Sequence, residues 1–387
     1  MRVTKVFNEF FSGEQGGVLL IACTLISLLL ANSSISESYI ALWHFELGSL
    51  SIEHWINEAL MAFFFLLIGL ELKREVLIGE LSSLKSAMLP IFAATGGMLI
   101  PAVIYLGFNF GTDTQHGFGI PMATDIAFAI GVLSLLGKRV PPSLKVFLTA
   151  VAVIDDLGAI IIIALFYTSD LSLLNLLLVS VLFAALMLFN KFKVRSFWIY
   201  LTGGIVMWYF MVHSGVHATL AGILLAIALP FEKGKPVSLS YKVEKQLHKP
   251  VALVVLPLFA LANTAVVFNN SWDKGLMENE SLGIITGLFV GKPLGVLLFS
   301  FIATVIGAAT LPDRLRWKHV LGAGLIAGIG FTMSIFITLL AFDSSHLITE
   351  SKISILFASL LSGLVGYSYL RYILKSRVRP SDKSGLK

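Results

Sequence analysis

Four ionisable residues stand inside otherwise apolar stretches of this 387-residue sequence. They are Asp125, the neighbours Asp155 and Asp156, and Lys292. At the centre of a membrane-spanning helix each such charge would cost about 2.5 to 3.5 kcal/mol, so residues of this kind face one another or water and are typical of ion pathways. The alternative is a set of ion pairs that only lock helices together. Three acids and one base leave a surplus of negative charge, which a purely structural pairing does not need.

Adjacent carboxylates such as Asp155 and Asp156 can bind either a proton or a cation, so the two ligands compete for one site. Oxygen ligands without histidine or cysteine suit a hard metal ion. The charge of the group suits a monovalent ion, because calcium takes more oxygen ligands and the sequence has no EF-hand-like loop. These residues predict a site that binds a hard monovalent cation or protons, with Asp155 and Asp156 as the metal ligands.

The composition indicates which elements must position these residues. Hydrophobic residues make up 57% of the chain and charged residues only 13%, whereas a soluble domain has about 25% charged residues. The mean hydropathy is +0.88. Allowing for interruptions, apolar runs of about 20 residues predict roughly twelve membrane spans. Because the runs are continuous and not alternating, helices satisfy the backbone groups in lipid better than a barrel does. The sequence predicts an all-α polytopic membrane protein.

The first apolar run has two interpretations. It could be a cleaved signal peptide, or it could be the first membrane span. The run follows a long polar segment that contains Glu9 and Glu14, and it lacks a clear small-residue cleavage site, so the membrane span is favoured. The only cysteine, Cys23, lies in this run and excludes a disulfide framework.

The basic residues follow the positive-inside rule. The isoelectric point near 9.1 would suggest a nucleic-acid partner in a soluble protein. With the N-terminus inside, however, the loops between the predicted spans place every lysine and arginine on the cytoplasmic side except Lys274, Lys352 and Lys292. The first two fall in outer loops and the third in a span. The pattern predicts cytoplasmic N- and C-termini, contact with membrane lipid and no nucleic-acid partner.

Two of the predicted spans carry signals for a break. Thr124 precedes Asp125, and Pro121 removes a backbone donor in the same segment, so this helix is expected to break near the middle of the bilayer. The glycine-rich segment 322–332 is a candidate for a matching break. Half-helices that meet in lipid present positive N-terminal and negative C-terminal ends, which Asp125 and Lys292 could compensate respectively. Alternatively, the glycines only permit close helix packing.

Six separated segments together resemble the NhaA-type sodium/proton antiporters, and the resemblance extends over nearly the whole chain. The segments are Phe63–Glu75, Pro121–Ala129, Asp155–Tyr167, Ser214–Gly222, Gly291–Gly295 and Gly328–Phe336. The family implies one antiporter domain over residues 1–387, with about twelve spans and two inverted repeats whose broken helices cross at the site. The repeats would cover roughly residues 87–167 and 282–374.

The resemblance also implies residue roles. Asp155 and Asp156 would form the cation and proton site, and Asp125 and Thr124 would lie at the crossing. Lys292 would pair with a carboxylate and balance the helix ends. The implied activity is electrogenic, with more protons entering than Na⁺ or Li⁺ leaving, and it is switched on toward alkaline pH. No cofactor and no organic substrate are expected.

The family's location is the bacterial inner membrane, and its members are often homodimers, which we expect here. The outer stretch 32–55 is long enough to form a small hairpin against a partner.

The family's pH-response cluster at the cytoplasmic funnel matches Glu71, Glu75, Glu244 and His248. Lys245 stands where the best-known member has a histidine, so the pH threshold does not carry over. For Glu71 and Glu75 the alternative is a solvated helix end paired with its basic neighbours. His217 is a further pH candidate because histidine titrates near neutrality, although a lone histidine in an apolar span is more often a packing residue. The list of pH candidates is Glu71, Glu75, Glu244, His248 and His217.

Other functional classes remain. An intramembrane aspartyl protease also uses paired acids, but side chains at adjacent helix positions point about 100° apart, so Asp155 and Asp156 are poor partners and Asp125 would have to supply the second carboxyl. The sequence has no Gly-x-Gly-Asp signature. A passive channel or a sodium-coupled solute symporter is the third class.

Overall fold

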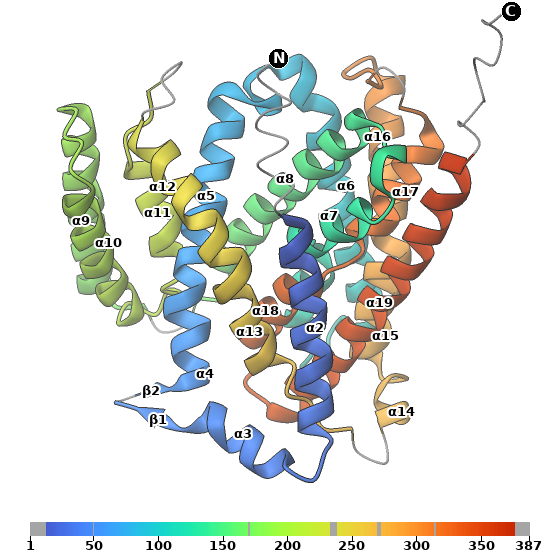
Figure 1. Cartoon of the computed structure of the whole chain (residues 1–387), viewed down its shortest axis with the longest axis horizontal. Helices are drawn as coiled ribbons and strands as arrows, with labels where there is room; N and C mark the ends of the chain where they lie inside the picture. The colour runs from blue at the N-terminus through green and yellow to red at the C-terminus, as the bar shows by residue number, and fades with distance from the viewer. Residues whose placement is uncertain are drawn as a thin grey trace, which may run out of the picture.

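The computed structural model describes residues 13–48, 50–168, 171–232, 238–268, 272–312 and 315–375. Both chain ends, for which cytoplasmic positions were predicted, lie outside these residues. Almost all regular structure is helical (Figure 1). The helices are α2 (Gly13–Ala31), α3 (Ser36–His44), α4 (Ile52–Trp55), α5 (Met61–Ile78), α6 (Leu84–Asn109), α7 (Ile126–Ser134), α8 (Pro142–Phe166), α9 (Leu173–Lys191), α10 (Phe197–Val212), α11 (Leu220–Ala228), α12 (Leu239–Pro250), α13 (Leu256–Asn263), α14 (Trp272–Gly275), α15 (Asn279–Thr286), α16 (Lys292–Val305), α17 (Trp317–Ala327), α18 (Phe331–Ala341) and α19 (Ser345–Lys375).

Within the described ranges, eight helices are long and apolar enough to cross a membrane, or up to ten if each bent helix pair counts as one span. The prediction of an all-α polytopic membrane protein is confirmed. The predicted number of twelve spans is not reached by this criterion, partly because α10 is only 16 residues long. A short apolar helix falls below the length of about 20 residues that crosses the hydrocarbon alone.

Three of the long spans contain a short π-helical segment. These segments are Ile56–Leu60 between α4 and α5, Val251–Val255 between α12 and α13, and Gly287–Gly291 between α15 and α16. Pro250 precedes the second segment, where its missing N–H interrupts the regular hydrogen bonding. π-Helical turns are frequent at functional sites, and the third segment ends directly before Lys292.

Both predicted helix breaks are present. The 3₁₀-helical segment Gln115–Met122 and α7 are separated by extended backbone that includes Asp125, whose φ and ψ are −82° and 98°. Helices α17 and α18 are bent by 50° relative to each other at their break. The close-packing role of the glycines is also present, because a Cβ atom on Gly324 would lie 2.7 Å from Cα of Pro293.

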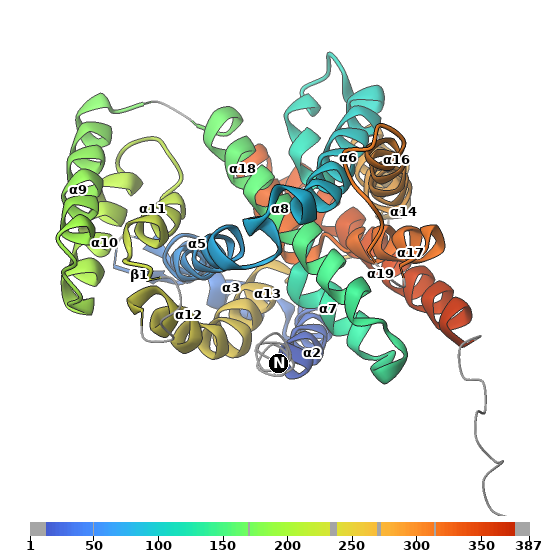
Figure 2. The ribbon, with the colours of Figure 1, turned by 90° about the horizontal axis from the view of Figure 1, so that it is seen from above.

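The two broken spans belong to two trios with the same order of elements. Helix α6 is followed by the first broken span and by α8, and the span from α15 to α16 is followed by the second broken span and by α19. Helices α6 and α16 lie side by side when the molecule is viewed from above (Figure 2) and pack through Gly96 and Gly295, where neither position has room for a side chain. The inverted symmetry and the repeat boundaries 87–167 and 282–374 stay predictions.

The two ends of the molecule differ. Helix α3, α14 and a two-stranded hairpin, β1 (Glu46–Leu47) with β2 (Leu50–Ser51), lie at the lower end in Figure 1, here named the hairpin end. The stretch 32–55 thus contains the expected hairpin, and its contact with a partner stays a prediction. Lys274 lies in α14 at this end, but Lys352 was wrongly predicted to lie in an outer loop, because it is buried in α19.

Candidate functional site

The two helix breaks contact each other. The backbone N–H of Asp125 donates to the carbonyl of Ile329 over 2.7 Å. The hydroxyl of Thr124 lies 2.9 Å from the carbonyl oxygen of Ala327, and the hydroxyl of Ser334 donates to the carbonyl of Ile120. Extended backbone in lipid is tolerated only where it is buried in protein or lines a cavity, and each break therefore supplies partners for the other.

Asp125 caps two helices with one carboxylate. Its Oδ1 accepts a hydrogen bond of 2.9 Å from the N–H of Phe128 in α7. Its Oδ2 accepts from both the N–H and the hydroxyl of Thr332, in the first turn of α18. A helix N-terminus carries the equivalent of about half a positive charge, so the structure places Asp125 at the positive ends that the sequence suggested.

Lys292 lies at the opposite kind of helix end. Its Nζ is 2.9 Å from Oδ2 of Asp155, and both side chains are fully buried. The same ammonium group donates to the carbonyl of Met122, the last residue of the 3₁₀-helical segment. The hydroxyl of Thr124 is 2.8 Å from Oδ2 of Asp155. Lys292 therefore balances one carboxylate and one negative helix end at the same time.

Asp155 and Asp156 face different surroundings although they are neighbours in α8. Side chains at consecutive helix positions point about 100° apart. Asp155 points to Lys292 and Thr124, whereas Asp156 lines a cavity together with Asp125. Within the described part of the chain, Oδ1 of Asp155 and Oδ1 of Asp156 are buried without a hydrogen-bond partner. Each carboxylate thus keeps one oxygen available for a ligand.

The cavity has an empty volume of about 780 Å³, counted with its open mouth, and is lined by α2, α5, α7, α8, α12, α13 and α18. Its few polar side chains are Asp125, Asp156, Glu71 and His248. No group of three Asp, Glu, His or Cys side chains within the described ranges comes together as a metal site. Sodium bound here would therefore need hydroxyl, carbonyl or water oxygens in addition to Asp155 and Asp156.

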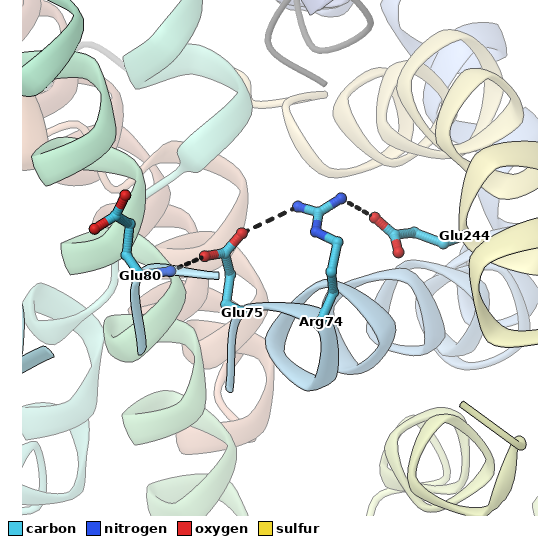
Figure 3. A network of polar contacts seen from close by, with 4 residues as sticks. All are labelled: Arg74, Glu75, Glu80 and Glu244. Carbon is cyan, nitrogen blue, oxygen red and sulfur yellow. Dashed lines mark hydrogen bonds and ion pairs between the residues drawn. The ribbon is translucent and has the colours of Figure 1, made fainter. Parts of the chain in front are cut away.

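Four of the pH-response candidates, Glu71, Glu75, Glu244 and His248, lie around Arg74 in a partly buried network at the end of α5. Figure 3 shows Arg74 between two acids: its guanidinium pairs with Glu244 of α12 and lies 3.3 Å from Oε1 of Glu75. The other oxygen of Glu75 accepts a hydrogen bond from the N–H of Glu80. Glu71 is 8% exposed. The alternative of a solvated helix end is thus wrong for Glu71, and the central cation, Arg74, was noted in the sequence only as a neighbouring charge.

His217 lies apart from this network. Its Nε2 is 2.7 Å from the carbonyl oxygen of Tyr167, at the end of α8. The network lies toward the other end of α11, where Lys73 donates to the carbonyls of Ala226, Ile227 and Leu229. Burial lowers the pKa of His217 because the charged ring loses water, and the hydrogen bond to Tyr167 partly opposes this shift. The contacts match the packing interpretation of this histidine.

Thr332 is the site residue that the sequence did not single out. It supplies two of the three hydrogen bonds to Asp125. It ends the glycine-rich segment, and the available signal was a hydroxyl group directly after that segment, in the first turn of a new helix. The paired-acid chemistry of a protease is not supported, since the partner of Asp155 is Lys292 and not a second carboxyl group.

Two broken helices cross inside the protein, and buried acids and one buried lysine lie at the crossing, where a cavity reaches them. This arrangement defines a polytopic transporter for a small ion. Residues 8–370 of the chain match a family model that is described as Na⁺/H⁺ antiporter 1.

Similar proteins cover nearly the full chain. A Flavobacterium johnsoniae protein named Na(+)/H(+) antiporter NhaA 1 is 57% identical over 97% of this chain and 98% of its own length. Proteins named Na(+)/H(+) antiporter NhaA from Flavobacterium psychrophilum and Dechloromonas aromatica are 56% and 54% identical, over 98% and 96% of this chain and 99% and 97% of their own lengths. The chain belongs to the NhaA family of Na⁺/H⁺ antiporters.

Proposed function

We propose that this protein carries out electrogenic exchange of Na⁺ or Li⁺ for protons in the bacterial inner membrane, expelling the cation and admitting protons. The names of its relatives support the exchange. The single observation that carries the proposal is the buried ion pair of Asp155 with Lys292, beside Asp156 at the inner wall of the cavity. No other charged pair among the described residues is fully buried.

The pair sets the order of events. In the sodium-free state Lys292 carries its proton and neutralises Asp155, while Asp156 holds a proton. Sodium enters through the cavity and binds between the free oxygens of Asp155 and Asp156. Asp156 then releases its proton, and Lys292, displaced from Asp155, releases a second one. Two protons leave for one Na⁺, so the two states differ by one net charge and the cycle moves charge across the membrane.

In this proposal Thr124 and Asp125 keep the two helix breaks in position. The hydroxyl of Thr124 has one hydrogen and two acceptors within reach, Asp155 and Ala327. When sodium occupies Asp155, the hydroxyl can turn its hydrogen to Ala327 and offer its oxygen to the ion. Asp125 remains a carboxylate that joins the N-termini of α7 and α18. Sodium and lithium are cargo here, and no cofactor or organic substrate takes part.

Activation at alkaline pH is assigned to the network around Arg74. Arg74 of α5 pairs with Glu75 in the same helix and with Glu244 of α12. Glu71 and His248 line the cavity that also reaches Asp156. A change of charge in this network would alter the packing of α5 against α12. We propose that it opens or closes the route for sodium. His217, which contacts Tyr167, would support this region only through α11.

The orientation follows from the basic loops. The end of the molecule opposite the hairpin end would face the cytoplasm, together with both chain termini, and lipid would surround the outer helices. The hairpin would meet its copy in a homodimer. Twelve spans and two inverted repeats would complete the architecture.

Everted membrane vesicles test the exchange directly. Addition of Na⁺ alone to respiring vesicles loaded with a pH-sensitive dye should dissipate the proton gradient, and an imposed membrane potential should change the rate. A sodium-coupled symporter would require an added solute, and a passive channel would carry Na⁺ without moving protons. Absence of any sodium-dependent pH change in correctly inserted protein would refute the proposal.

A further inference from the structure

A second group of buried polar side chains lies at the hairpin end, where α15 begins against α6 and α19. Glu280, in the first turn of α15, is 2% exposed. Asn109 at the end of α6 donates to the carbonyl of Asn279 over 3.0 Å, which ties these two helices together beside Glu280. From α19, the hydroxyl of Ser351 donates to Oε1 of Glu280. None of these residues contributes to the crossing.

The carboxyl group of Glu280 is only half satisfied. Its Oε2 is buried without a hydrogen-bond partner among the described residues, as are the hydroxyls of Ser281 and Ser354. The nearby Tyr105 donates its hydroxyl to the carbonyl of Thr114 and not to Glu280. Buried polar groups normally have partners, and an exception in a folded protein calls for an explanation.

The charged groups around Glu280 do not neutralise it. Glu278, which precedes α15, and Glu350 of α19 add negative charge nearby. His346 is 3.3 Å from Glu350 and is 70% exposed, so it is directed to that residue and to solvent. Lys352 interacts with Glu53. A metal cation would find two carboxyl oxygens here, whereas a neutral acid needs no counter-charge and brings its own donor hydrogen.

Four buried serines of α19 lie between this carboxyl group and the crossing, and we refer to them as the hydroxyl row. The serines are Ser351, Ser354, Ser359 and Ser362, and each is at most 4% exposed. At 3.6 residues per turn they project within about 140° of one another around the helix axis, which is less than half of its circumference. The hydroxyl of Ser359 accepts a hydrogen bond from the N–H of Phe331, where α18 begins. The hydroxyl of Ser362 would be 2.8 Å from a Cβ atom on Gly328, so it lies against the break itself. This hydroxyl row spans about 16 Å at 1.5 Å per residue.

We propose that Glu280 is a proton-exchange residue at the hairpin end, joined to the crossing by the hydroxyl row of α19. The proposal rests on the Na⁺/H⁺ exchange proposed above. A hydronium ion at the hairpin end gives its proton to the carboxylate of Glu280 and becomes water. The acid then passes a proton to the row and returns to carboxylate. Each serine hydroxyl accepts one proton and gives up one, with water between the serines, so the row is unchanged after transfer.

The isosteric Glu280→Gln substitution separates this role from a structural one. The amide oxygen can still accept the hydrogen bond from Ser351, but glutamine cannot exchange a proton. Glu280→Asp keeps the ionisable group, and Asp343→Asn removes an exposed acid just before α19 as a matched control. Purified protein in proteoliposomes would be assayed for Na⁺-driven proton movement while the pH is varied on one side at a time.

We expect Glu280→Gln to slow exchange about tenfold or more when proton supply from the hairpin end limits the rate, as for loss of a proton-transfer group. The KM for Na⁺ should stay within a factor of about two, Glu280→Asp should restore part of the rate, and Asp343→Asn should match the parent. A Glu280→Gln protein with the parent's pH profile on both sides would overturn the proposal.

Infrared spectroscopy keeps the test independent of transport. A pH-difference spectrum of the parent should contain a carboxylic-acid C=O band that moves in Glu280→Asp and is missing in Glu280→Gln. If Glu280→Gln does not fold, an unmoved band in Glu280→Asp would overturn the proposal. A band removed by Na⁺ at fixed pH would show cation binding in place of proton exchange, and would also overturn it. If the parent transports nothing, the proposed function fails while this measurement still decides on Glu280.

Discussion

Replacement of Lys292 tests the ion pair at the centre of the proposed mechanism. Lys292→Ala removes the cation from a fully buried pair and leaves Asp155 with the hydroxyl of Thr124 as its one remaining hydrogen-bond donor among the described residues. It also leaves the carbonyl of Met122 without the ammonium donor. Breaking a buried pair by removing one partner costs about 3 to 5 kcal/mol of folding free energy, so a clear fall in melting temperature is expected.

The loss of stability in Lys292→Ala should depend on pH. A proton taken up by Asp155 removes the stranded charge, so the difference in stability between Lys292→Ala and the parent should shrink as the pH is lowered. Lys292→Met fills the space without a charge and isolates the electrostatic part. The double variant Asp155→Asn with Lys292→Met should recover much of the stability, because a neutral amide needs no counter-charge, and the cycle of single and double variants measures the coupling between the two residues.

Lys292→Arg tests proton carriage separately. Guanidinium stays protonated at every working pH, so the variant should keep the stabilising pair but lose the proton that Lys292 releases. Exchange should persist at a reduced rate with an altered pH profile and a smaller response to membrane potential. Melting temperature and transport of each purified variant would be measured at several pH values. An alanine variant as stable as the parent, together with an arginine variant of unchanged pH profile, would refute both roles.

Three further outcomes are expected. Asp156→Asn should abolish exchange but leave membrane insertion and melting temperature near those of the parent, because the amide keeps the shape of the side chain but cannot exchange a proton; normal transport would contradict the site. Lowering the pH should raise the apparent KM for Na⁺, because protons and sodium use the same carboxylates; a constant KM across the active range would indicate separate sites. Burial holds the pKa of His217 below its ordinary value. As the pH falls through about 6.5, the unfolded chain therefore takes up a proton on this histidine before the folded chain does, and the parent should lose stability on acidification. His217→Gln should flatten that part of the melting curve against pH, and an identical curve would exclude this contribution.

The sequence was most informative where membrane chemistry leaves few solutions. A charge in an apolar run must find a partner inside the protein. For this reason the sequence alone identified the candidate site residues, which are Asp125, Asp155, Asp156 and Lys292. The break near Pro121 was predictable for the same reason, because a missing donor and a neighbouring acid suit a helix end. These features depend on local residue types and not on the path of the chain.

Features that depend on the tertiary arrangement were less accessible. Arg74 stands among several charges at the end of α5, and only the position of α12 shows that it bridges Glu75 and Glu244. Lys352 follows a polar turn and was assigned to a loop, whereas the structure continues α19 through it. Short helices such as α10, which has 16 residues, blurred the count of spans because they fall below the length that crosses the hydrocarbon alone.

The roles proposed for the adjacent Asp155 and Asp156 depend on how their hydrogen bonding differs from that of Asp125. Both oxygens of Asp125 are engaged by three donors from α7 and α18, so this carboxylate cannot take up sodium without releasing the helix ends that it joins. Asp155 and Asp156 each retain one oxygen without a partner in the described structure, and they project from one rigid helix at an angle of about 100°. One of them faces the lysine and the other faces the cavity. In the proposed mechanism, a cation that arrives from the side of Asp156 and bridges the two free oxygens competes with Lys292 for the charge of Asp155. This competition would couple cation entry to proton release within a single helical turn.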